Sequence, residues 1–210
     1  FDKSTEKVQK PKYESIALNY NNLAITSDAF SAFGHFDSDW HSYSAELIPE
    51  TIVHKGIPFK MGTQDLNNAL ACKGQNVNLP SGTAGVYLLV ASSENDTTAT
   101  FIVNDNSVMR QIPYYSGFFG GGNWKDQYTA FLKKGDVAYV GSHRHDSRKR
   151  NEAYVHTYMY MIFIPVEKGT TQITLPDDPN VNIFAATAIK SDLNIAEPAT
   201  EIVTVLVPNK

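Results

Sequence analysis

The 210-residue chain contains 42% apolar and 19% charged residues and carries a formal net charge of −4. This balance excludes a disordered or fibrous chain, and a chain of this length can bury roughly 70% of its unfolded surface. The acidic balance argues against a nucleic-acid partner, because phosphate binding needs a basic face. No run of about 18 uncharged apolar residues is present, so no membrane span is expected.

The sequence divides into three expected segments. Residues 1–18 have mixed charge and no hydrophobic period, and they predict a linker or N-terminal extension that becomes ordered near Tyr13. Residues 19–191 form the expected folded module, and residues 192–210 predict a C-terminal tail or the start of a following module. The first residue is Phe1 rather than Met, which indicates a mature or truncated protein. The single cysteine, Cys72, permits no internal disulfide and is expected to be a buried small hydrophobe.

The stretch from residue 19 to residue 50 is rich in Asn, Asp, Ser and Gly with interspersed aromatics, which indicates an ordered loop. Asp37 and Asp39 are spaced as in a calcium loop, but the Gly and the terminal Glu of an EF-hand do not follow. A looser calcium site of carboxylates and backbone carbonyls stays open. Its alternative is a network of Asx turns that holds the loop.

Short runs of strand-forming residues then alternate with turn signals, and no long amphipathic helix interrupts them. This pattern predicts an all-β antiparallel sandwich or barrel of about nine or ten strands. Asn104-Asp105-Asn106 predicts a short hairpin, and Gly85–Ser92, apolar on both faces, predicts a central strand. The nine candidate strands are Glu50–Val53, Ile57–Met61, Gly85–Ser92, Thr98–Val103, Ser107–Ile112, Val137–His143, Tyr154–Ile164, Thr171–Leu175 and Asn182–Ile189.

One glycine-rich aromatic stretch, Pro113–Trp124, is too irregular for a strand. It predicts either a long loop that covers one end of the sandwich or a loop that presents Tyr114, Tyr115 or Trp124 to a ligand.

The densest polar chemistry lies between the strand-like runs Val137–His143 and Tyr154–Ile164. From Tyr154 onward, a period of two separates an apolar core face from a face of Tyr and His. The second face either packs under another layer with its hydroxyls hydrogen-bonded or lies open as a stacking platform. The loop expected between the two strands offers donors and acceptors of both signs, from Ser142, His143, Arg144, His145, Asp146, Arg148, Lys149, Arg150, Asn151 and Glu152.

The sequence contains only some of the residues that serine hydrolysis, metal-dependent catalysis or glycoside hydrolysis requires. Gly-x-Ser-x-Gly is absent, and Ser142 and His143 are adjacent strand residues that point to opposite faces, which disfavours serine hydrolysis. His143 and His145 could form a three-histidine metal site with His156 or His41, but no His-Glu-x-x-His helix or Cys pair supports it. Glycoside hydrolysis needs two facing carboxylates, for which the candidates are Asp37, Asp39, Glu46, Asp126, Asp146 and Glu152.

Two blocks of the sequence resemble modules attached to bacterial glycoside hydrolases. Gly34–Gly62, GHFDSDWHSYSAELIPETIVHKGIPFKMG, resembles the pattern F-D-G-x-G-x-S-Y-x-A-E-x-L-P … G-x-x-F through Phe36, Asp37, Ser42, Tyr43, Ala45, Glu46, Leu47 and Pro49. The later block resembles the accessory region of some glycoside hydrolase family 38 (α-mannosidase-type) proteins through Ser142, His143, Arg144, His145, Asn151, Glu152 and Tyr154. The pattern prefers Gly at Ser38, and Asp39-Trp40-His41 replaces a small flexible run, which places Trp40 where a sugar could stack.

The resemblance, which covers roughly residues 20–190, implies a jelly-roll or galactose-binding-like sandwich that accompanies a carbohydrate-active enzyme. It also implies a secreted or periplasmic bacterial protein, with no catalytic residue in this region. The leading hypothesis is a non-catalytic accessory module that binds carbohydrate weakly, with a dissociation constant of roughly tens of micromolar to millimolar. Arg144 and Glu152 would hold sugar hydroxyls while Trp40 stacks. The expected binding residues are His143, Arg144, His145, Asn151, Glu152, Asp37, Trp40 and Trp124, and apart from calcium no metal or cofactor is expected.

Two alternatives stay open. In the first, the His143–Glu152 region is an internal network that packs the module against a glycoside hydrolase domain of the same parent chain. In the second, the chain is an enzyme in its own right, a glycosidase or a metal-dependent hydrolase.

Overall fold

A computed structural model describes residues 11–118 and 134–190. Within these residues the chain forms fifteen strands and two short 3-10 helices. In chain order they are β1 (Lys12–Ile16), β2 (Ile25–Thr26), η1 (Ser31–Phe33), β3 (Ser42–Ser44), η2 (Ala45–Leu47), β4 (Thr51–His54), β5 (Ile57–Lys60), β6 (Leu70–Ala71), β7 (Asn76–Asn78), β8 (Thr83–Ser92), β9 (Thr97–Val103), β10 (Asn106–Ile112), β11 (Ser116–Phe118), β12 (Asp136–His145), β13 (Asn151–Pro165), β14 (Gln172–Thr174) and β15 (Val181–Lys190). Neither of the two helices is long and apolar enough to cross a membrane.

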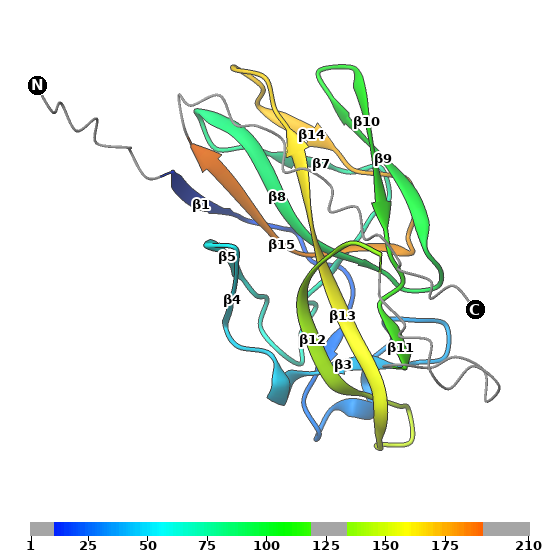
Figure 1. Cartoon of the computed structure of the whole chain (residues 1–210). Helices are drawn as coiled ribbons and strands as arrows, with labels where there is room; N and C mark the ends of the chain where they lie inside the picture. The colour runs from blue at the N-terminus through cyan, green and yellow to red at the C-terminus, as the bar shows by residue number, and fades with distance from the viewer. Residues whose placement is uncertain (1–10, 119–133, 191–210) are drawn as a thin grey trace, which may run out of the picture.

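Most strands join one large sheet. Its order is β1-β15-β8-β13-β12-β3-β2, with β11 paired to β13 and β6 paired to β15. A second sheet has the order β10-β9-β14-β7, and β4 pairs with β5. Figure 1 shows β9, β10 and β14 in the upper half of the molecule and β3, β11 and β12 in the lower half, with β13 reaching through both. The architecture is an all-β sandwich, as the sequence predicts.

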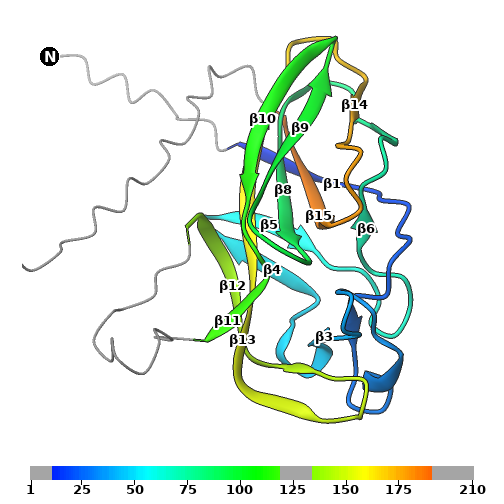
Figure 2. The same cartoon turned by 90° about the vertical axis from the view of Figure 1, so that its right-hand side faces the viewer.

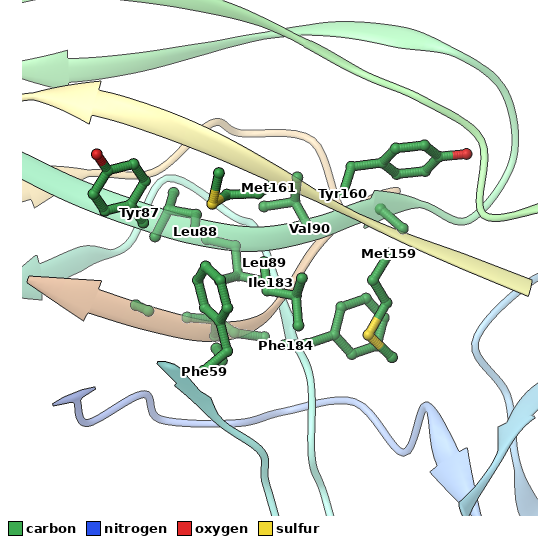
Figure 3. Close-up of a cluster of buried hydrophobic side chains, with 14 of the residues drawn as sticks. Phe59, Tyr87, Leu88, Leu89, Val90, Met159, Tyr160, Met161, Ile183 and Phe184 are labelled. Carbon is green, nitrogen blue, oxygen red and sulfur yellow. The ribbon is translucent and has the colours of Figure 1, made fainter. Parts of the chain in front are cut away.

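The core lies on both faces of the central strands β8, β13 and β15. The register places Tyr160 and Thr187 on opposite faces. Tyr160 donates a hydrogen bond to the carbonyl of Tyr114, which follows β10, and Thr187 donates to the carbonyl of Pro58 in β5. Figure 3 accordingly shows Phe59 and Tyr160 on opposite sides of these strands. The four-stranded sheet and the segment after β10 therefore cover one face of the central strands. The β4–β5 hairpin covers the other.

The tyrosine face of β13 is packed along the second half of the strand. Tyr158 and Tyr160 are both buried, so this part of the face lies under another layer and is not an open stacking platform, whereas Tyr154 near the start of the strand is 78% exposed. Residues of β8 are buried on both faces of the strand, and β8 lies between β15 and β13, which confirms it as a central strand. Cys72 is also buried, as its sequence context predicts.

Two tight turns close hairpins with the expected turn chemistry. Asn104 and Asp105 join β9 to β10 with φ of 47° and 65°, and Lys55 and Gly56 join β4 to β5 with φ of 50° and 81°. Positive φ at both central positions is the type I′ arrangement, whose twist matches that of the flanking strands. The hairpin predicted at Asn104-Asp105-Asn106 is confirmed.

All nine strands expected from the sequence are present, with ends that differ by at most three residues. The sequence pattern misses β1, β2, β3, β6, β7 and β11. These strands have two to five residues, too few for a period-two pattern to stand out. β1 lies within the stretch expected as an extension and forms an edge of the large sheet by pairing with β15.

Candidate functional site

Strands β12 and β13 extend into the stretch that the sequence assigns to a loop. β12 continues to His145 and β13 begins at Asn151, so the loop prediction is wrong at both ends. Charged residues on both faces of these strand ends hide the alternation from which a strand is predicted. Figure 2 shows the long β12–β13 hairpin reaching the lower end of the molecule, with β3 beside it.

Asp146 holds the turn between these strands. Its Oδ1 accepts hydrogen bonds from the backbone N–H groups of Arg148 (2.9 Å) and Arg150 (3.0 Å). Its Oδ2 accepts a hydrogen bond from Nε of Arg150 at 2.7 Å. The Asp146 carboxylate is therefore occupied by the turn, and Lys149 adopts a φ of 59° at its tip.

The register of the hairpin divides the expected site into two clusters. Arg144 pairs with Glu152, and His145 pairs with Asn151. Because neighbouring strand residues point to opposite faces, Arg144 lies on one face of β12 while His143 and His145 lie on the other.

The first cluster, here called the Arg144 network, consists of Arg144, Glu152, Asp37, His41 and Tyr115. Nε of Arg144 donates to Glu152 at 2.6 Å, and its Nη1 donates to Oη of Tyr115 at 3.0 Å. The same Nη1 lies 3.6 Å from the Asp37 carboxylate. Tyr115 donates to Asp37 at 2.5 Å, and Nδ1 of His41 lies 2.9 Å from the same carboxylate. The network thus satisfies its own charges.

Burial and hydrogen bonding set the charge states in this network. Burial opposes ionisation of Asp37, but hydrogen bonds from His41 and Tyr115 outweigh it and hold the pKa of that carboxyl below its ordinary value. Burial and the neighbouring Asp37 charge raise the pKa of Tyr115, so its hydroxyl stays protonated. Burial also opposes the charge of Arg144, but its contacts with Tyr115 and Glu152 prevail and raise its pKa. The network holds one cation between two carboxylates.

Asp37 also builds the turn that carries Trp40. Its Oδ1 accepts hydrogen bonds from the backbone N–H groups of Asp39 (3.1 Å) and His41 (2.9 Å), and its carbonyl accepts one from Trp40 (3.2 Å). These are the bonds of an Asx-turn network. Trp40 adopts a φ of 63° with 55% of its surface exposed, and its ring centroid lies 5.9 Å from that of His35. The turn presents an indole to solvent from a rigid base.

The second cluster, here called the His145 cluster, consists of His145, Thr26, Asp28, Glu46 and Asn151. His145 is wholly buried; its Nδ1 lies 3.0 Å from Oγ1 of Thr26, and its Nε2 lies 3.1 Å from Oδ1 of Asp28. The backbone N–H of Asp28 donates to Glu46 at 2.8 Å, and Nδ2 of Asn151 lies 3.5 Å from Asp28. Burial lowers the pKa of His145, and the nearby carboxylates of Glu46 and Asp28 only partly oppose this, so the imidazole is neutral at pH 7.

The remaining expected residues fall outside these two clusters. The His143 ring lies 5.9 Å from that of His145, and its Nδ1 lies 3.2 Å from Oγ of Ser142. Trp124 lies outside the described residues. Because His41 belongs to the Arg144 network, it is separated from the face of β12 that carries His143 and His145.

The structure adds residues that sequence reasoning does not select for binding, above all Thr26 and Asp28. Thr26 and Asp28 come from the Asn- and Asp-rich stretch, where β2 pairs with β3 and β3 pairs with the end of β12. These pairings join segments far apart in the sequence. Tyr115, which the sequence offers as a residue presented to a ligand, is instead wholly buried, so it supports the site from inside.

Comparison with known proteins agrees with the fold. The family profile described as the AziU2-like beta-sandwich domain matches residues 12–192. No curated protein matches the sequence. The match confirms the β-sandwich module, but it makes no connection to glycoside hydrolase family 38 or to carbohydrate. The chain belongs to the AziU2-like beta-sandwich domain family.

Proposed function

We propose that the chain is a non-catalytic β-sandwich module that binds carbohydrate weakly, with Trp40 as the stacking residue. The observation that carries this proposal is the exposed Trp40 indole, held at a φ of 63° by hydrogen bonds to Asp37. Positive φ is strained for a bulky residue, and such strain gathers at ligand-binding positions. An indole held in this way can pack against the C–H face of a sugar ring.

Polar groups beside Trp40 can reach sugar hydroxyls. Asp39 is exposed, and the backbone N–H of Ser38 donates to Glu94 at 3.0 Å, which brings a second, half-buried carboxylate to the same turn. Carboxylates accept hydrogen bonds from hydroxyls. In this arrangement Arg144 and Glu152 position the turn through Asp37, and the groups at its rim contact the ligand.

The Arg144 network supports binding rather than hydrolysis. The carboxylates of Asp37 and Glu152 both face Arg144, whereas a glycosidase needs two carboxylates that flank a substrate bond. The proposal that the parent protein is a secreted bacterial glycoside hydrolase rests on the sequence resemblance alone.

A second candidate is a structural module that packs against another domain of its parent chain. The observation that favours it is the closure of the Arg144 network, whose charged groups are satisfied within the chain. In this case the network stabilises the fold, and no sugar binds at Trp40.

Affinity electrophoresis and a glycan array tell the two candidates apart. The panel contains mannans, galactans, host-type N-glycans and plant polysaccharides. Trp40→Ala should lose binding while its melting temperature stays that of the wild type, because the indole is exposed. Met109→Ala, which removes an exposed apolar side chain on β10, should bind like the wild type. A wild-type chain that binds no glycan, or Trp40→Ala with full binding, would overturn the proposal.

A stability measurement on Arg144→Ala tests the role of the network. Removing the cation takes the arginine partner from the Asp37 and Glu152 carboxylates, and we expect a loss of about 3 kcal/mol in the free energy of unfolding. The matched control is Arg148→Ala in the neighbouring exposed turn, which should change this free energy by less than about 0.5 kcal/mol. Equal stability of the two variants would contradict a structural role. Turnover of a chromogenic glycoside by the wild type would contradict the non-catalytic assignment.

A further inference from the structure

We propose that Asp28, Glu46 and His145 bind a divalent transition-metal ion of the Zn²⁺ class. One potential ligand atom from each of the three lies within 4.8 Å of the others. Neighbouring ligands of a tetrahedral zinc ion lie about 3.4 Å apart, so rotations of the exposed Asp28 and Glu46 side chains would close the site. The site lies on the face of β12 opposite the Arg144 network and is independent of the carbohydrate proposal.

The Nε2 atom of His145 points to a missing partner. His145 is wholly buried, and this nitrogen has no hydrogen bond among the described residues. It lies 3.1 Å from Oδ1 of Asp28 without forming a hydrogen bond to it. A buried polar nitrogen without a hydrogen bond is costly, and a metal ion between the imidazole and the carboxylate would satisfy both.

Thr26 is placed to select the metal-binding tautomer. A metal at Nε2 requires the proton on Nδ1, and Oγ1 of Thr26 lies 3.0 Å from Nδ1. Thr26 in turn lies 2.6 Å from Oγ of Ser42, so its own hydroxyl proton has an acceptor. An outer hydrogen bond of this kind fixes the ring of a metal-ligating histidine.

The two carboxylates supply the charge. Asp28 and Glu46 are exposed, and in the part of the chain that the structure describes neither forms an ion pair with Lys or Arg. Glu46 is oriented by the backbone N–H of Asp28 at 2.8 Å and by Oγ of Ser44 at 3.0 Å. Two adjacent carboxylates without a cation repel each other, and a divalent ion would remove that repulsion.

The donor set selects the class of ion. Imidazole favours zinc and other first-row transition ions, whereas calcium and magnesium favour oxygen ligands alone. Three protein ligands leave the fourth position of a tetrahedral ion open. Because the Asp28 side chain is exposed, water or a further ligand can reach this position.

Isothermal titration of the tag-free full chain, freed of metal with a chelator, tests the site with Zn²⁺, Mn²⁺, Ca²⁺ and Mg²⁺ in separate titrations. We expect saturable binding of one Zn²⁺ per chain. Asp28→Asn and Glu46→Gln should each weaken it by about tenfold or more, because even outer-shell changes cost about 10–100-fold in affinity. The control Asp105→Asn removes an exposed carboxylate in the β9–β10 turn and should bind Zn²⁺ like the wild type.

A second readout does not depend on variants that fold. In imidazole ¹⁵N spectra of the wild type, Zn²⁺ should shift the Nε2 resonance of His145 and leave that of the exposed His35 unchanged. Absence of Zn²⁺ binding, equal affinity in Asp28→Asn, or an unshifted His145 resonance at saturation would each overturn the proposal. Binding of Ca²⁺ without Zn²⁺ would overturn the assigned class of ion.

Discussion

Asp37 makes the folded state sensitive to acid. Although burial opposes its ionisation, hydrogen bonds from His41 and Tyr115 hold its pKa below the ordinary value. The unfolded chain therefore binds more protons than the folded chain between the two pKa values. The stabilisation from ionised Asp37 is complete above the unfolded pKa of about 4, and it is lost as the pH falls through the lower, folded-state pKa.

Urea unfolding from about pH 6 down to about pH 3 measures this contribution. The wild type should lose stability below about pH 4 more steeply than Asp37→Asn, because Asn does not titrate. Asp105→Asn removes an exposed carboxylate and should keep the wild-type slope. If the Asp37→Asn profile runs parallel to that of the wild type, the network does not hold the Asp37 pKa down.

Single residues of the site were predictable to different degrees. Arg144 and Glu152 stand out in the sequence because charged residues interrupt two strands, and their pairing follows once the short turn between them is known. The partnership of Asp37 with Tyr115 could not be predicted, since 78 positions separate them and only the packed sheet brings them together. The same holds for Thr26 and His145, which are 119 positions apart.

At the scale of elements, Gly85 is required where β8 passes beneath an aromatic ring. A Cβ at this position would lie 2.5 Å from Cζ of Phe163 on the neighbouring strand β13. Phe163 is buried and cannot turn away freely. Gly85→Ala should therefore lower the free energy of unfolding by about 1–3 kcal/mol through overpacking.

A double-mutant cycle, followed by urea unfolding, assigns this cost to the ring. In a Phe163→Leu background the smaller side chain leaves room, so the same Gly85→Ala change should cost much less than in the wild type. An equal cost in both backgrounds would mean that the backbone of β8, rather than the Phe163 ring, demands glycine.

Length decided which elements the sequence could predict. Strands such as β8, β13 and β15 carry ten or more residues, so a long apolar or alternating run marks each of them in the sequence. Strands β2 and β6 have two residues each and exist only because longer strands hold them in place. The type I′ turn at Asn104 and Asp105 was predictable because its residue types tolerate positive φ.

At the scale of the whole molecule, the spacing of strands and turns was enough to predict a sandwich, but not the order of its strands. β1 pairs with β15 and β8 pairs with β15, so distant parts of the chain meet in one sheet. Such pairings depend on which segments cover the two faces of the sheet. A local sequence pattern does not indicate this. The pairings also tie both sheets into one continuous cluster of buried side chains.

This shared core predicts that the two sheets unfold together. Phe101 lies on β9 in the four-stranded sheet, is wholly buried, and belongs to the same cluster as Tyr160 and Phe184 of the large sheet. Phe101→Ala should lower the free energy of unfolding by about 3–5 kcal/mol, because it opens a cavity in the common core. Near-UV circular dichroism reports the buried tyrosines of the large sheet, and far-UV circular dichroism reports both sheets.

Under this prediction, the near-UV and far-UV denaturation curves of Phe101→Ala should coincide and move to lower urea concentration together. Met109→Ala on the adjacent strand β10 removes an exposed side chain and should leave both curves in place. If the far-UV curve of Phe101→Ala separates from a near-UV curve that stays at the wild-type midpoint, the four-stranded sheet unfolds on its own. Since the Arg144 network and the His145 cluster both lie on the large sheet, they would then withstand damage to the smaller sheet.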